Sequence, residues 1–141
     1  MSLTLKPEYF VQPPVELFAA VAEDYANQRI TSSKNTNQLT QLRKFYAELL
    51  RWYEQVFYQD SPQRREIELH AVLPYIKMLK AKATYAQHRK HVGEDFVQMF
   101  NLCIDGIVCP ISLKHAKLFM EAFIGYRKAT SNQGAHAPCR D

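Results

Sequence analysis

The chain has 141 residues, of which 47% are apolar, 12% aromatic and 23% charged; this fits one globular domain and argues against both wholesale disorder and a two-domain enzyme. Only four glycines leave few positions for tight turns, which disfavours an all-β fold, a dinucleotide-binding loop and a P-loop. Lysine and arginine number 18 against 14 aspartates and glutamates, which gives a net charge of +4. Because this excess of positive charge is small, it indicates a binding partner only if the cations are concentrated in one part of the chain.

Hydrophobic periodicity predicts helices along most of the chain. After an N-terminal extension over residues 1–13, a first helix is expected over about 14–29, where Pro14 suits the first turn. A polar link over 31–37 precedes the longest clear helix, at about 38–58, which carries a wide apolar stripe.

A third helix is expected over roughly 63–89, with Ser61 as its N-cap and Pro62 in its first turn. Pro74 lies inside this segment. Because proline removes one backbone hydrogen bond and collides with the preceding turn, it predicts either a kink or a junction between two helices. We favour one kinked helix, since the apolar spacing continues unbroken across Pro74.

A fourth helix, at about 94–107, opens with acidic residues that complement the positive end of the helix dipole. A fifth helix, capped by Ser112, runs to about Lys128. The remaining residues, 129–141, carry little apolar surface and are expected to form a mobile C-terminal tail. Five helices joined by short links predict an all-α fold, a compact helical bundle domain over 14–128.

No apolar run approaches the roughly 20 residues of a membrane span, and the N-terminus lacks the basic-then-apolar order of a signal peptide. The three cysteines, Cys103, Cys109 and Cys139, form no Cys-x-x-Cys pair. An odd number of cysteines without a secretory signal indicates free thiols in a reducing compartment, with Cys103 buried in the core. We therefore expect a soluble cytoplasmic protein without a membrane partner.

Motifs for catalysis or metal binding are missing. The five histidines form no His-Glu-x-x-His pattern, and two cationic residues between His88 and His91 disfavour a metal ion there. The sequence therefore predicts no cofactor, no metal and no enzyme activity. The alternative is an enzyme whose site is assembled in space around Cys103 or His70.

The uneven feature of the chain is its charge. No acidic residue lies between Glu68 and Glu94, and the cations of this stretch are Lys77, Lys80, Lys82, Arg89 and Lys90. Projected on a helix they form two rows, one of which has Tyr85 between its cations. Such a helix suits a polyanion, because cations bind phosphates and Tyr85 can stack on a base or pack on a sugar.

A second group of cations, Arg43, Lys44 and Arg51, lies on the preceding helix, where it alternates with glutamates. This alternation favours mutual neutralisation on that surface. For the stretch around Tyr85, the alternative is a solvated helix face, since lysine commonly keeps such a face in water.

Three segments carry a family pattern in matching order: Thr-Gln-Leu-Arg-Lys-Phe-Tyr at 40–46, Leu-Lys-Ala-Lys-Ala-Thr-Tyr-Ala at 79–86 followed by Arg89, and Phe-Met-Glu-Ala-Phe-Ile-Gly-Tyr-Arg-Lys at 119–128. Together, over about 37–128, they resemble the small α-helical subunit of type III-A CRISPR effector (Csm) complexes. Four cations match family positions: Arg43, Lys80, Lys82 and Arg89.

The resemblance implies a non-catalytic structural subunit of a ribonucleoprotein that acts in antiviral defence. Several copies stack head to tail beside the backbone subunits that hold the guide RNA, while nuclease and cyclase activities belong to other subunits. The implied partners are guide RNA, target RNA, other copies of the chain, and the backbone and large subunits. We assign RNA binding to Lys77, Lys80, Lys82, Arg89 and Lys90, with Arg43, Lys44 and Arg51 as a second group. The alternative is a helical protein–protein adaptor that makes no nucleic-acid contact.

Overall fold

The computed structural model of the protein describes residues 4–33 and 35–136, with side chains as far as Arg127. The described part contains helices and loops and no strand, so the expected all-α bundle of about five helices is confirmed. The elements are a 3₁₀ turn (Pro7–Phe10), an N-terminal helical segment that contains α1 (Ala22–Asp24), α2 (Leu39–Phe57), α3 (Pro62–Lys77), α4 (Leu79–His88), α5 (Glu94–Asp105) and α6 (Pro110–His136).

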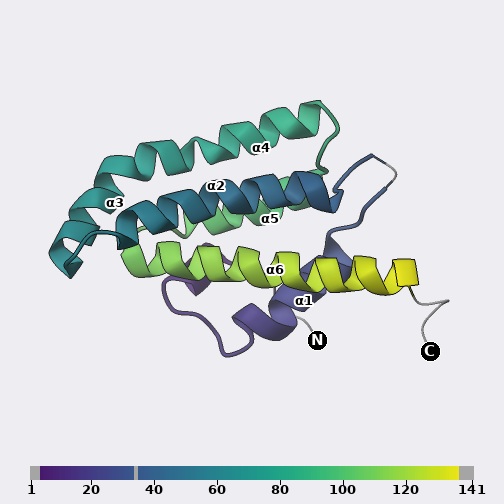
Figure 1. Ribbon diagram of the computed structural model, residues 1–141, viewed down its shortest axis with the longest axis horizontal. Helices are drawn as coiled ribbons and strands as arrows, with labels where there is room; N and C mark the ends of the chain where they lie inside the picture. Colours follow the sequence, from purple (N-terminus) through teal and green to yellow (C-terminus); the bar gives the residue numbers. More distant parts are fainter. Residues whose placement is uncertain (1–3, 34, 137–141) are drawn as a thin grey trace.

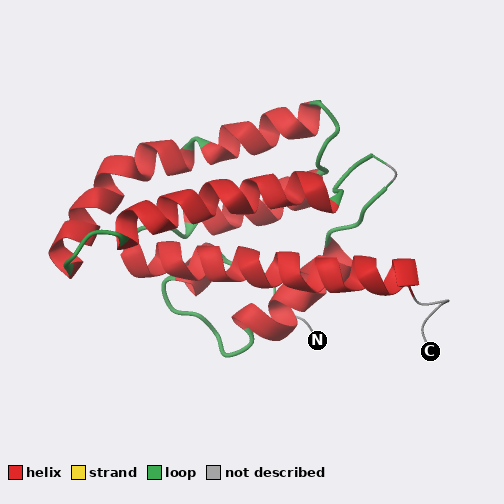
Figure 2. Ribbon diagram, in the orientation of Figure 1, coloured by secondary structure: helices red, strands yellow, loops and turns green. Residues whose placement is uncertain are grey.

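The bundle has two long edges (Figure 1). Helices α3 and α4 lie end to end along one edge, and the N-terminal segment with α1 lies along the other. Between them run α2 and α6, with α5 behind α2 in this view. Short loops join α2 to α6 in turn, whereas longer loops flank the N-terminal helical segment (Figure 2). Because α3 packs on α2 and α4 packs on α5, the α3–α4 rod has α2 on one side and α5 on the other.

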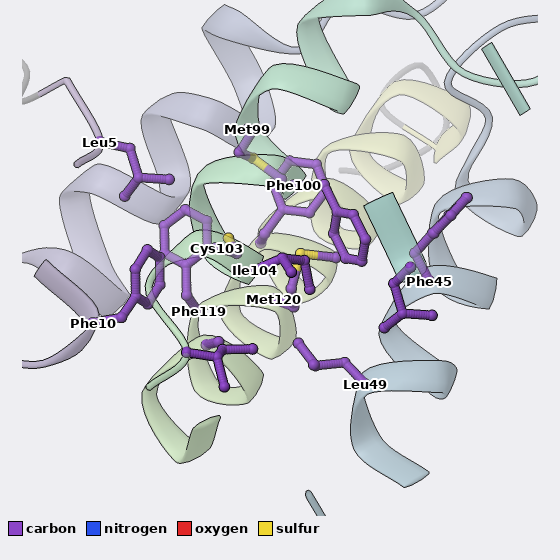
Figure 3. Close-up of a cluster of buried hydrophobic side chains, with 14 of the residues drawn as sticks. Leu5, Phe10, Phe45, Leu49, Met99, Phe100, Cys103, Ile104, Phe119 and Met120 are labelled. Atoms are coloured by element: carbon purple, nitrogen blue, oxygen red, sulfur yellow. The ribbon is translucent and has the colours of Figure 1, made fainter. Parts of the chain in front are cut away.

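A continuous apolar core holds these helices together (Figure 3). Phe45 of α2 packs on Phe96 and Phe100 of α5, with ring centroids 5.4 and 5.2 Å apart. Cys103 is fully buried, as expected, and burial raises the pKa of its thiol far above the ordinary 9.0. The thiol therefore packs as a small apolar group.

The N-terminal helical segment is irregular. It is π-helical over Leu17–Val21, α-helical over Ala22–Asp24 and π-helical again over Tyr25–Arg29. The residues before it, expected to form an extension, bury Leu5 and Phe10 in the same core as the helices. The segment thus closes one side of the bundle.

The third predicted helix is two helices that meet at Met78, one turn after Pro74. The preference for a single helix is met in part: α3 continues through Pro74 to Lys77, and its break from α4 at Met78 is minor. Met78 keeps helical backbone angles, φ −65° and ψ −18°, although its ψ is less negative than the usual helical value of about −42°. Its N–H still donates to the Pro74 carbonyl at 3.1 Å, so the two helices remain nearly in line.

Two serine caps were predicted, and one is confirmed. Ser61 precedes Pro62 and its hydroxyl accepts a hydrogen bond from the N–H of Arg64 at 3.2 Å. Ser112 is not the cap of α6, because that helix already begins at Pro110. Its hydroxyl instead accepts hydrogen bonds from the two amides that precede the helix, those of Val108 at 2.8 Å and Cys109 at 3.0 Å.

The last helix is longer than predicted. It runs to His136 rather than to Lys128, and the first proline after Pro110 is Pro138. No residue between these prolines removes a backbone donor from the helix. The expected mobile tail stays a prediction where it falls on 137–141, which lie outside the described residues.

Candidate nucleic-acid interface

Two of the predicted RNA-binding lysines hold the α3–α4 rod against α5. Lys77 Nζ donates a hydrogen bond to the Ile104 carbonyl at 3.0 Å, and Lys80 Nζ lies 2.5 Å from Asp105 Oδ1. Burial lowers the pKa of Lys77, and the Asp105 carboxylate opposes this shift. Both ammonium groups lie at the C-terminal end of α5, where the helix dipole is negative.

The other predicted cations of α4 lie on the α2 side or at the helix end. Lys82 Nζ is 3.5 Å from Glu48 Oε2 of α2, and the Lys82 side chain is 50% exposed. Arg89 donates to Tyr85 Oη at 3.1 Å, with its guanidinium 5.7 Å from the ring centroid. Lys90 ends the helix in a left-handed conformation, φ 65°, and is exposed. Because an exposed ion pair contributes only about 0–1 kcal/mol, Lys82 can exchange Glu48 for a phosphate.

The second predicted group, Arg43, Lys44 and Arg51, is exposed on α2. None of the three forms a salt bridge within the described residues, so the expected mutual neutralisation does not take the form of ion pairs. Glu48 pairs with Lys82 of the neighbouring helix instead. Lys44 precedes Glu48 by one turn and so lies on the same side of α2, next to α4.

An aromatic pair joins α2 to α3 on this side of the rod. Trp52 stacks on Tyr75 with ring centroids 5.9 Å apart and planes inclined by 15°. The Arg51 guanidinium lies 5.6 Å from the Trp52 ring centroid. Tyr75 is 58% exposed and Tyr85, further along the rod, is 61% exposed.

Cations and aromatic rings of α2, α3 and α4 therefore share one surface, which we name the α2–α4 face. Its residues are Lys44, Arg51, Trp52, Tyr75, Lys82, Tyr85 and Arg89. Of the other predicted residues, Lys77 and Lys80 lie at the opposite side of the rod, and Arg43 and Lys90 lie beside the face. Sequence reasoning missed Tyr75, although its spacing of seven residues from Lys82 places both on one side of a helix.

Neither a metal cluster nor an activated nucleophile at Cys103 or His70 is found in the part of the chain that the structure describes. Among those residues, no three His, Cys, Asp or Glu side chains could hold a metal ion. His70 pairs with Glu66 at 2.8 Å on the exposed side of α3, and the Cys103 thiol is buried with a raised pKa. Neither provides an accessible, activated nucleophile. No helix within the described ranges is both long and apolar enough to cross a bilayer.

Comparison with known proteins assigns the fold to a family. A family model described as Csm2 Type III-A matches residues 12–133, which include every residue of the α2–α4 face. A search of curated proteins and a search of solved structures each found no match. Since the match covers most of the chain and agrees with the resemblance of its three helical segments, the chain belongs to the Csm2 Type III-A family, the small subunit of the type III-A CRISPR Csm complex.

Proposed function

We propose that this chain is a non-catalytic structural subunit that stacks in several copies beside the guide-RNA backbone of the effector complex and contacts RNA phosphates in antiviral defence. It acts in the cytoplasm. Its partners are guide RNA, target RNA, other copies of the chain, and the backbone and large subunits. The α2–α4 face makes the RNA contacts, through Lys44, Arg51, Lys82 and Arg89, with Arg43 and Lys90 beside it.

One observation carries this proposal: cations from α2 and α4 gather on one side of the α3–α4 rod, and the rod itself carries no carboxylate after Glu68. Glu48 is the acid paired there, through a loose contact of 3.5 Å with Lys82. Phosphates of a polyanion can replace such a contact, and the counter-ions they release supply most of the affinity. Lys77 and Lys80 stay in the proposal as contacts from the opposite side of the rod.

The test measures RNA binding by the assembled effector complex over a range of salt concentrations, with Lys82→Gln and Arg89→Gln combined. Neutral substitutions are chosen because a carboxylate at position 82 would face Glu48. Each phosphate contact that is lost lowers the slope of log affinity against log salt by about 0.7–0.9. We expect weaker binding and a shallower slope.

The matched control is the combination Arg64→Gln and Lys114→Gln, which removes the same charge away from the face. Arg64 lies in the first turn of α3, with its side chain 70% exposed beside Asp60, and Lys114 lies on α6. This control should leave the salt slope unchanged. If the Lys82 and Arg89 double variant also keeps the wild-type affinity and slope, the proposed RNA contact is wrong.

An adaptor role without nucleic-acid contact is favoured by one different observation. Ile67 and Met78 on the outer side of the rod are 69% and 58% exposed, and exposed apolar side chains on one element commonly mark a protein interface. In that case Ile67→Ser weakens assembly of the complex, while the charge-neutralised variant binds RNA as the wild type does.

A further inference from the structure

A single row of exposed side chains follows α3 and α4 on the side next to α2: Tyr75, Met78, Lys82, Tyr85 and Arg89. The steps are three, four, three and four residues, the spacing that keeps side chains on one side of a helix. The spacing holds across the helix junction because Met78 keeps helical backbone angles. Two cations, Lys82 and Arg89, therefore lie in one row with two tyrosines and a methionine.

Two of the rings in the α2–α4 face have an arginine beside them. The Arg51 guanidinium is 5.6 Å from the centroid of Trp52, and the Arg89 guanidinium is 5.7 Å from the centroid of Tyr85. Trp52 in turn supports Tyr75, which stacks on it and stays 58% exposed. Each pair of an arginine and an aromatic ring thus places an aromatic surface beside a positive charge. These are the two groups that bind the base and the phosphate of one nucleotide.

We infer that the α2–α4 face binds unpaired nucleotides of single-stranded RNA, with bases stacked on Tyr75 and Tyr85 and phosphates held by the cations between and beside them. This inference rests on the proposed function and narrows it. In a duplex the bases are stacked inside the helix, so a duplex offers the face its phosphates alone. Tyr75 and Tyr85 are ten residues apart, about 15 Å along the rod. This distance leaves space for further nucleotides between the two rings, over Met78 and Lys82.

The composition of the row favours RNA over a protein partner. Tyrosine, methionine and arginine are also common in protein interfaces, but lysine is depleted there, and Lys82 lies in the middle of this row. The flanking helix adds Lys44 and Arg51 on the same side. A polyanion with aromatic bases complements both kinds of group at once.

The experiment uses the single tryptophan of the chain, which lies in the face and reports its occupancy by fluorescence. The full-length protein is titrated at low salt with short oligouridine, with an RNA duplex of equal length and with inorganic polyphosphate. We expect oligouridine to quench Trp52 and to bind more tightly than the duplex. Tyr85→Leu should weaken oligouridine binding by about 5- to 100-fold and leave duplex binding unchanged, while Tyr85→Phe keeps the ring and retains the affinity.

The matched control is Tyr58→Leu, since Tyr58 is 87% exposed at the end of α2 and lies outside the face; it should change neither affinity. Equal losses for oligouridine and duplex, or an unchanged Trp52 signal, overturn this inference and leave the phosphate contacts standing. No binding of any of the three polyanions, together with an unchanged salt slope in the assembled complex, overturns the proposed function itself. If Tyr85→Leu alters assembly but not RNA affinity, the row is a protein interface and the inference is wrong.

Discussion

Arg127 of α6 donates from Nη2 to the backbone carbonyl oxygen of Asn37 at 3.2 Å, which ties the last helix to the loop before α2. Its Nη1 donates to the carbonyl of Ala26 at 2.9 Å and to that of Ile30. The residue is only 6% exposed. Burial lowers the pKa of Arg127, and the charge of Asp95 opposes this shift. One guanidinium thus satisfies three carbonyls and joins three segments of the chain.

Replacing Arg127 by leucine should lower the free energy of unfolding by about 3 kcal/mol, because three carbonyls lose a charged donor and the remaining cavity walls are polar. Urea denaturation measures the change. The control is Arg64→Leu, an arginine with a 70% exposed side chain, which should change stability by about 0.5 kcal/mol or less. Similar unfolding midpoints for the two variants would contradict the structural role of Arg127.

Asn37 is held in a left-handed conformation, φ 58°, by its own side chain. Its Nδ2 donates to Asp95 Oδ1 at 2.9 Å, and its Oδ1 accepts from the N–H of Gly93 at 2.8 Å. Asn37→Gly removes these hydrogen bonds, but glycine adopts the left-handed conformation without strain. Asn37→Ala also removes the hydrogen bonds, and alanine is strained in that conformation. We expect both to be less stable than the wild type, with the alanine variant lower than the glycine variant by about 1 kcal/mol in thermal or urea unfolding. An alanine variant as stable as the glycine variant would exclude backbone strain at this position.

The parts of the fold that local signals encode were predictable. Ser61 and Pro62 mark the start of α3, and both have the predicted place in the structure. The apolar periods identified the helices of the bundle. The sequence could not predict the contacts of Arg127. Its partners lie about a hundred residues earlier in the chain, and they are backbone carbonyls, which every residue has. The π-helical turns on either side of α1, in a segment that packs on α6, also had no signal in the sequence.

The candidate site was predictable in composition but not in arrangement. Counting charges located the stretch without carboxylates, yet it could not show which neighbour each cation faces. Lys80 and Lys82 are two residues apart and therefore point to opposite sides of α4, one to Asp105 of α5 and the other to Glu48 of α2. The opposing helices decide which cations keep access to solvent, and their order in space is a property of the whole bundle.

Gly106 allows the N-terminal segment to approach the end of α5. A Cβ atom at this position would lie 2.5 Å from the Pro7 carbonyl oxygen and 2.8 Å from Cδ2 of Phe10. Gly106→Ala should therefore displace the segment and lower the unfolding temperature. The matched control is Gly125→Ala on α6, where an added Cβ meets nothing within 4 Å; it should stabilise the protein by about 1 kcal/mol, because alanine has the higher helix propensity. Equal effects of the two substitutions would show that the close approach does not matter.

Cys103 should make the protein less stable in alkaline solution. Burial raises the pKa of its thiol well above the ordinary 9.0, so above that pH the native state keeps a proton that the unfolded chain loses. Stability contributed by this group is complete below pH 9.0 and falls as the pH rises, by about 1.4 kcal/mol per pH unit. Cys103→Ala removes this dependence but not that of the lysines and tyrosines, which titrate in both proteins. The free energy of unfolding of both proteins is measured in urea from neutral to strongly alkaline pH. The wild type should be the more stable protein at neutral pH, and its advantage should shrink as the pH rises until the alanine variant is the more stable. A difference that stays constant would mean that the thiol ionises as freely in the folded protein as in the unfolded chain.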